Sequence, residues 1–365
     1  MNRTHYCLFI ALLLGLPLGG VWLAGHDLAH YLEFPPRTQH VQHAPFSWPV
    51  FIGLAIAILA TVVPFLLRVF RAGGADAVCP GGEASAPPTK RSFPWWGWLG
   101  IGLGVVLWIL AWTRMPWMEP LQLYTFTPQW FAYIVVINAL TYRRTGRCLL
   151  THETQFLFWL FPLSAAFWWF FEYLNRFVQN WYYVGCEHFT PLQYFAMATL
   201  AFSTVLPAVL STEEWLRAHP RSYAGLEFNT ALGIGNPKTT GSLTVLIASA
   251  GLFFIGWFPD YLYPLLWVAP LLLLIGFRWM GKRLCFPEVA NGDWRRVYRF
   301  ALAALICGFF WELWNWHSLA KWVYSVPFVH RFQLFEMPIL GYAGYLPFGL
   351  ECAVVADLIR RGNAA

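Results

Sequence analysis

Formal charge is scarce in this sequence. Only 12% of its 365 residues are Asp, Glu, Lys or Arg, whereas 58% are hydrophobic. A soluble protein carries roughly twice that share of charge, about 25%, so a chain of two or three soluble domains is not expected. The 22 Trp residues are typical of membrane interfaces and apolar cavities. The composition therefore predicts an all-α, polytopic membrane protein.

Two other signals are missing. The seven Cys residues show no paired spacing, so neither a disulfide framework nor a zinc motif is indicated. The net charge of +6 comes from short basic clusters rather than one continuous stripe, so nucleic acid is not an expected partner. The bilayer is the expected partner, no cofactor is predicted, and the oligomeric state is left open.

Apolar runs are long enough to cross about 30 Å of hydrocarbon in ten places. They lie near residues 6–25, 47–67, 94–113, 127–142, 154–174, 190–210, 242–258, 261–280, 297–316 and 336–358. Ten spans place both termini on one side. If that side is cytoplasmic, nineteen of the 24 Lys and Arg residues lie inside and five outside, as the positive-inside rule requires. We expect an inner-membrane (cytoplasmic membrane) protein with both termini in the cytoplasm.

The first apolar run has an alternative interpretation. Arg3 precedes a stretch that ends near Ala24 and Gly25, which also fits a cleaved signal peptide. Either interpretation leaves residue 26 outside, so the remaining topology is unchanged.

The chain is predicted to contain five parts. Residues 1–70 form a two-helix hairpin with a His-rich outer loop, and residues 71–92, rich in Gly, Ala and Pro, form a flexible cytoplasmic linker. Residues 93–214 and 241–361 form two membrane repeats of four spans each, with a cytoplasmic connector at 215–240 between them.

The repeats rest on an internal match at an offset of 140 residues. It pairs Phe170 with Phe310, Glu172 with Glu312, Asn175 with Asn315, Gln193 with Gln333, Phe195 with Phe335, Met197 with Met337, Leu200 with Leu340, Leu206 with Leu346, Pro207 with Pro347 and Leu210 with Leu350. One residue further on, Trp181 and Tyr183 pair with Trp322 and Tyr324. An even number of spans per unit predicts a parallel duplication about an axis along the membrane normal, with a central seam between the halves.

Each repeat carries Glu and Asn at positions i and i+3 near the outer end of a span. Glu172 and Asn175 lie in FFEYLN, and Glu312 and Asn315 lie in FWELWN. A carboxyl group is costly at this depth, so it is a functional candidate by default. The alternative is a structural role in which these side chains bond helix-end carbonyls or a neighbouring helix.

The two Glu residues have different neighbours in the sequence. Arg176 follows Glu172 by one turn, whereas Trp side chains and His317 surround Glu312. We expect the cation to keep Glu172 ionised and the apolar setting to keep Glu312 protonated, giving one base and one acid. Glu336 is matched with Ala196 in the repeat, so it has no acidic counterpart, and it is a third candidate for the same pocket.

The first outer loop contains a candidate metal site. His26, His30 and Glu33 would share one face if this segment were helical. Two His side chains and a carboxylate are able to bind a divalent metal. The alternative is a set of interfacial loop histidines without a metal.

Three functions fit these features. The leading hypothesis is an enzyme that protonates, cyclises or isomerises an isoprenoid or other lipid, using paired Glu residues in an aromatic seam. Paired acidic residues in a membrane bundle are loosely similar to those of integral-membrane terpene and lycopene cyclases, although the Pro-x-Glu-Glu pattern of the latter is absent. The alternatives are a secondary transporter or channel that uses the same Glu pair, and a non-catalytic membrane subunit.

Overall fold

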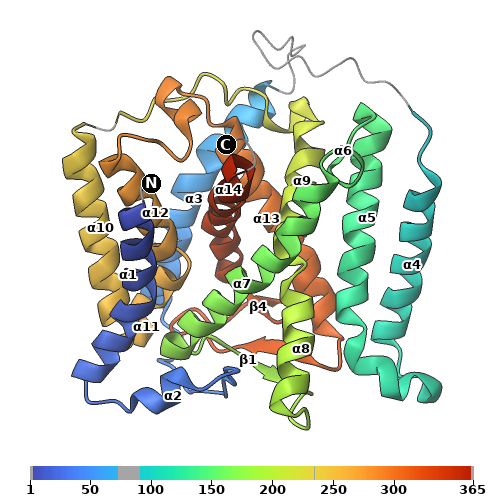
Figure 1. Ribbon diagram of the computed structural model, residues 1–365, viewed down its shortest axis with the longest axis horizontal. Coiled ribbons are helices and arrows are strands. Elements are labelled where there is room, and N and C mark those ends of the chain that lie inside the picture. The colour runs from blue at the N-terminus through green and yellow to red at the C-terminus, as the bar shows by residue number, and fades with distance from the viewer. Residues whose placement is uncertain (1–2, 73–90, 234, 363–365) are drawn as a thin grey trace.

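The protein is described here by a computed structural model, which covers residues 3–72, 91–233 and 235–362. Long helices run side by side and make up most of this part of the chain (Figure 1). Most of the predicted linker, residues 73–90, lies outside the described residues. The mostly helical architecture predicted from composition is confirmed.

The first half of the chain contains nine α-helices, two 3₁₀ helices and one strand among its described residues. These are α1 (Arg3–Leu23), α2 (Leu28–Leu32), α3 (Trp48–Ala72), α4 (Trp95–Trp112), η1 (Pro116–Tyr124), α5 (Phe126–Thr145), α6 (Leu149–His152), α7 (Thr154–Val178), β1 (Trp181–Val184), α8 (Pro191–Phe202), α9 (Val205–Arg217) and η2 (Pro220–Tyr223). A capping box between Thr190 and Gln193 begins α8.

The second half contains five α-helices, three 3₁₀ helices and three strands among its described residues. These are α10 (Pro237–Phe254), α11 (Pro259–Leu262), η3 (Tyr263–Leu266), α12 (Ala269–Met280), η4 (Pro287–Asn291), α13 (Arg295–Trp316), β2 (Lys321–Tyr324), β3 (Gln333–Leu334), β4 (Met337–Pro338), η5 (Ile339–Gly344) and α14 (Tyr345–Gly362). The start of α1 and the end of α14 lie at one end of the bundle, and the strands lie at the other (Figure 1).

Seven helices in the described ranges are long and apolar enough to cross a membrane, or eight if the bent pair 259–266 and 269–280 is one span. This is fewer than the ten spans expected from the sequence. The predicted runs 127–142 and 242–258 correspond to α5 and α10, which are helices but fall outside this apolar set. Polar residues explain the difference, because α5 buries Thr127, Gln129 and Asn138 along its length.

Two of the apolar segments are broken rather than continuous. The break between α8 and α9 is bridged by Ser164 of α7, whose hydroxyl donates to the carbonyl of Phe202 at 2.6 Å and accepts from the N–H of Leu206 at 3.0 Å. The pair formed by residues 259–266 and α12 bends by 56°. There the buried Glu351 of α14 accepts a hydrogen bond from the N–H of Leu271 at 3.1 Å. Each break is therefore satisfied by a side chain from a neighbouring helix, as a buried helix end requires.

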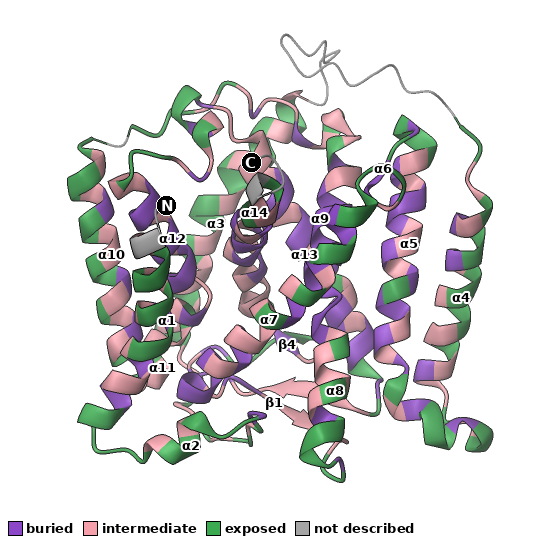
Figure 2. Cartoon of the chain, in the orientation of Figure 1, coloured by how far each residue is buried: buried purple, intermediate pink, exposed green. Residues whose placement is uncertain are grey.

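The core lies between the two halves. Buried residues are frequent on α9, α13 and α14, where they line the interior of the bundle (Figure 2). By contrast, α3 has no buried residue. It contacts the bundle near both of its ends, where Phe51 lies against Phe332 and Phe65 against Trp294.

The prediction of an all-α protein missed two short antiparallel pairs, β1–β2 and β3–β4. In the first, Trp181 pairs with Tyr324 and Tyr183 with Trp322. Tyr182 pairs with Val323, which lies 141 residues later and is its own counterpart in the repeat match. A segment that pairs with its own counterpart in this way has the self-complementary form of a twofold contact. The aromatic segments of the two halves therefore meet along one ribbon.

Candidate functional site

The candidate Glu and Asn residues are buried beside this ribbon. Glu172 and Asn175 lie on α7, and Glu312 and Asn315 lie on α13. All four have 0% exposure. Residues three apart in a helix lie on one face, so each helix directs a carboxyl and an amide group to the same side.

The two Asn side chains hold the start of each strand. Asn175 donates from Nδ2 to the carbonyl of Trp181 at 2.8 Å, and its Oδ1 accepts from the N–H of Asn180 at 2.8 Å. Asn315 donates to the carbonyl of Trp322 at 2.8 Å and accepts from the N–H of the same residue at 2.9 Å. Each amide thereby satisfies buried backbone groups where the chain leaves its helix. These contacts give both Asn residues a structural role.

Glu172 is surrounded by aromatic donors. Its Oε1 atom accepts hydrogen bonds from Nε1 of Trp168 at 3.1 Å, from Nε1 of Trp181 at 3.0 Å and from the hydroxyl of Tyr183 at 2.6 Å. Its Oε2 atom is buried and has no hydrogen-bond partner among the described residues. One oxygen of this carboxyl group is thus fully engaged, and the other is free.

Glu312 has a similar environment with different donors. Its Oε1 atom accepts from the hydroxyl of Tyr324 at 2.7 Å and from the hydroxyl of Tyr345 at 2.8 Å. Trp322, the counterpart of Trp181, donates instead to the hydroxyl oxygen of Tyr324 at 2.9 Å. The Oε2 atom is again buried without a hydrogen-bond partner among the residues that the structure covers.

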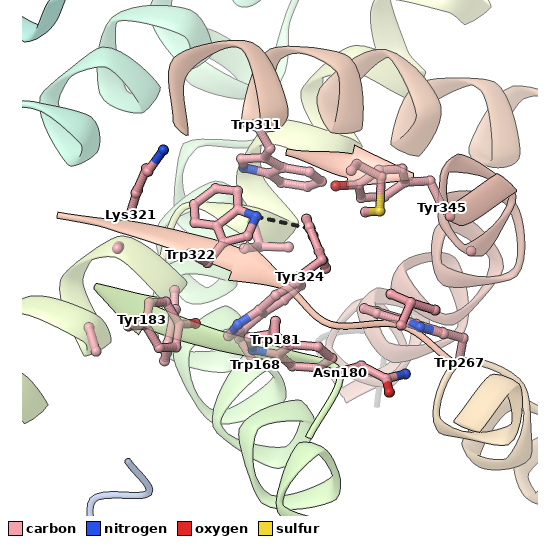
Figure 3. A pocket seen from close by; sticks show the side chains of 18 of the residues that line it. Trp168, Asn180, Trp181, Tyr183, Trp267, Trp311, Lys321, Trp322, Tyr324 and Tyr345 are labelled. Carbon is pink, nitrogen blue, oxygen red and sulfur yellow. Dashed lines mark hydrogen bonds between the residues drawn. The ribbon is translucent and has the colours of Figure 1, made fainter. Parts of the chain in front are cut away.

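These aromatic donors line a single cavity of about 380 Å³. Trp181 and Tyr183 enter it from β1, Trp322 and Tyr324 from β2, and Tyr345 from α14 (Figure 3). Neither Glu172 nor Glu312 lines the cavity. The two carboxyl groups therefore lie one layer behind an aromatic wall, and they reach the cavity through the side chains that hydrogen-bond to them.

The phenols of the ribbon remain protonated. Burial raises the pKa of Tyr183 well above its usual value, and the adjacent Glu172 carboxylate raises it further. Burial and then the Glu312 carboxylate have the same effect on the pKa of Tyr324. Both side chains are consequently hydroxyl donors at any physiological pH.

Glu336 lies in the turn between β3 and β4 and forms an ion pair with Lys321. It does not line the cavity, but Lys321 does. Among the described residues that line the cavity, Lys321 alone carries a formal charge. The aliphatic stem of Lys321 is able to cover apolar surface while its ammonium group faces Glu336, so the cavity wall is almost uncharged.

The outer-loop metal candidates are not brought together. The helix in this loop, α2, is only five residues long, so His26 precedes it and Glu33 follows it. Within the described ranges, no group of three or more His, Cys, Asp or Glu side chains is placed to hold a metal ion. Arg176 also binds this loop, because its guanidinium donates to the carbonyls of His30 and Glu33. The cation expected to pair with Glu172 is thus engaged by the loop backbone.

Sequence reasoning missed the donors around the two carboxyl groups. The signal for Tyr183 and Tyr324 was present, because the repeat match pairs them with each other. Trp168 and Tyr345 have no such signal, since Gly308 and Val205 stand at their matched positions. Comparison with protein-family profiles, with curated proteins and with solved structures gives no match at all. The geometry of this cavity is therefore the basis for any functional argument.

Proposed function

We propose that the chain crosses the inner (cytoplasmic) membrane ten times, with both termini in the cytoplasm. Successive long segments alternate in direction through the bundle (Figure 1), and the polar helices α5 and α10 pack against α4 and α12 rather than standing alone. The nineteen basic residues expected inside, against five outside, support the orientation. The ribbon and the cavity then lie near the outer leaflet.

The two halves are proposed to be copies of one four-span unit. Equivalent Asn residues bind the backbone of equivalent Trp residues, and equivalent Tyr residues bind equivalent Glu residues. The self-complementary register of β1–β2 is what two parallel copies related by a twofold axis would produce. Hydrogen-bond networks repeated in this detail support duplication more strongly than matched apolar positions do.

The function that the cavity supports best is acid–base chemistry on an unsaturated isoprenoid or lipid chain. The single observation that carries this proposal is the pair of buried Glu residues, each hydrogen-bonded to a Tyr that lines the same aromatic cavity. A volume of about 380 Å³ lies in the range of small-molecule sites, roughly 300–1,000 Å³. Indole and phenol faces stabilise cationic character, which develops when an alkene is protonated.

The side of the cavity closed by α3 is the proposed entrance for a lipid from the bilayer. Leu54 and Ile58, one turn apart on α3, form part of the cavity wall, and α3 buries none of its residues. A helix attached near its two ends is able to move aside in its middle, which opens the wall toward lipid. This arrangement favours a membrane-dissolved substrate over a water-soluble one.

A transporter or channel using the same Glu pair is supported less well. An ion path needs polar or charged groups that face it, whereas Lys321 is the charged lining side chain and already pairs with Glu336. Both candidate carboxyl groups are separated from the cavity by aromatic rings. In a non-catalytic subunit the buried Tyr–Glu contacts would serve only to hold the ribbon.

The test compares lipid extracts from cells with the gene, without it, and with variants restored. Deletion is expected to make one unsaturated lipid accumulate, and the double variant Glu172→Gln/Glu312→Gln is expected to leave that change in place. Glu351→Gln is the matched control, because Glu351 is also buried but bonds the backbone N–H of Leu271, which does not line the cavity. If deletion leaves the lipid profile unchanged, the enzyme proposal is wrong. If the double variant restores the wild-type lipid profile, the carboxyl groups are not needed for the reaction and the protein is a non-catalytic subunit.

A further inference from the structure

The two halves differ in the side chains that donate to the buried carboxyl group. Glu172 receives an indole N–H from Trp168 of its own helix, whereas Glu312 receives the hydroxyl of Tyr345 from the next span. Neither donor has a counterpart in the other half. Gly308 stands at the position that matches Trp168. Val205 stands where Tyr345 would be.

Gly308 is what allows Tyr345 to reach Glu312. A Cβ atom at position 308 would lie 2.4 Å from two ring carbons of Tyr345, closer than packed carbon atoms approach each other. The absence of a side chain on α13 therefore makes the space in which the Tyr345 ring lies. The Gly at position 308 and the Tyr at position 345 therefore depend on each other in the packing of this site.

The exchange changes what the carboxyl group is able to do with a proton. An indole N–H is only a donor, whereas a phenol hydroxyl both donates and accepts. Two of the three partners of Glu172 are indoles, so they fix Oε1 as an acceptor and pass no proton. Both hydrogen bonds to Oε1 of Glu312 come from phenols, which line the cavity and are able to reverse direction.

We propose that Glu312, Tyr324 and Tyr345 form the proton-transfer cluster and that Glu172 is a positioning residue that holds the ribbon. This inference rests on the proposed function and assigns its chemistry to the second half. The substrate class that it implies is an alkene. Protonation of an alkene followed by loss of a proton needs no oxidant or reductant, so it suits a cluster that only supplies and recovers one proton.

The reaction balances with one proton. Glu312 gives its proton to one phenol as that phenol gives its own to an alkene carbon, so that a C–H bond forms from the π pair and a cation forms on the adjacent carbon. A neighbouring C–H bond, or one on the newly closed ring if a second alkene attacks the cation, then releases its proton to the other phenol. The electron pair of that bond becomes the new double bond, and the proton returns to Glu312. Two phenols on one carboxyl group provide separate sites for delivery and removal.

Deuterium transfer tests this assignment directly. Purified full-length protein in detergent is incubated in D₂O with the total lipid extract of cells that lack the gene, and lipids that gain one deuterium are measured by mass spectrometry. Tyr345→Phe and Glu312→Gln are expected to lower the rate of incorporation by about 100-fold, the lower range for general acid–base catalysis. Gly308→Ala should resemble Tyr345→Phe, because the added methyl group displaces that ring.

The comparison variants are Tyr183→Phe and Glu172→Gln, which remove the same groups from the first half and are expected to lower the rate by a smaller factor. Glu351→Gln is the control that should keep a rate near that of the wild type, because neither Glu351 nor its partner Leu271 lines the cavity. If the two comparison variants lower incorporation as much as Tyr345→Phe and Glu312→Gln do, the assignment to the second half is wrong while the proposed function stands. If the wild-type protein labels no lipid in the extract, the proposed function itself fails.

Discussion

The two halves of the chain keep the same scaffold and differ in what surrounds it. Both use an Asn to hold the start of a strand and a Glu to bind a Tyr of that strand. They differ in the other donors to that Glu. They also differ in the ion pair at the ribbon, where Lys321 and Glu336 have no charged counterparts. The contacts that hold the ribbon are therefore equivalent in the two halves, whereas the remaining donors and the ion pair are not.

The end of the bundle opposite the ribbon shows a similar contrast (Figure 1). Arg299 of α13 and Glu213 of α9 form a buried ion pair across the halves at 2.7 Å. In a second ion pair, Arg360 of α14 lies 3.0 Å from Glu153, at the start of α7, but both side chains are more than two-fifths exposed. The same kind of contact between halves is therefore buried in one pair and solvated in the other.

The largest expected effect follows from this contrast. Glu213→Gln removes the charge that compensates the buried Arg299 guanidinium, so it should lower the free energy of unfolding by about 3 kcal/mol or more. The comparison variant Glu153→Gln breaks an exposed pair and should cost less than about 1 kcal/mol. Thermal unfolding of the two purified variants in the same detergent measures both. If both variants lower the free energy of unfolding by the same amount, the two ion pairs are equally closed to water.

The scaffold prediction comes next in size. Asn175→Ala and Asn315→Ala each leave buried backbone groups of the adjacent strand unpaired, at a cost of about 2 kcal/mol for each variant. The losses should be similar, because the two side chains make matching contacts. Unfolding midpoints, together with near-ultraviolet circular dichroism of the Trp-rich ribbon, provide the measurement. If Asn175→Ala lowers the free energy of unfolding and Asn315→Ala does not, the two halves are not equivalent.

Much of this scaffold could be predicted from the sequence. The i, i+3 spacing of Glu and Asn predicts that they lie on one helix face, and the repeat match pairs Tyr183 with Tyr324. Pattern was sufficient here because both features depend on spacing along one helix or on similarity between two segments.

The remaining features depend on contacts that a single segment does not encode. Tyr345 reaches Glu312 only because Gly308, on another helix, leaves space for its ring. The strands were missed because four aromatic residues form a β-pair only when a second such segment lies opposite. The helix breaks were hidden because Ser164 and Glu351 satisfy them from neighbouring helices. The metal prediction assumed a helix through residues 26–33, but Asp27 caps a helix that begins only at Leu28.

The smallest expected effect concerns the ion pair at the ribbon. Glu336→Ala gives the second half the residue of the first, where Ala196 stands, and releases Lys321 from its carboxylate. Because both side chains retain some contact with solvent, the free energy of unfolding should fall by less than about 1 kcal/mol. Thermal unfolding in detergent checks this value, with Lys321→Met as the reciprocal variant. If either change costs as much as the Asn variants, the pair supports the ribbon itself, and the division between a repeated scaffold and a variable periphery has to be redrawn at this turn.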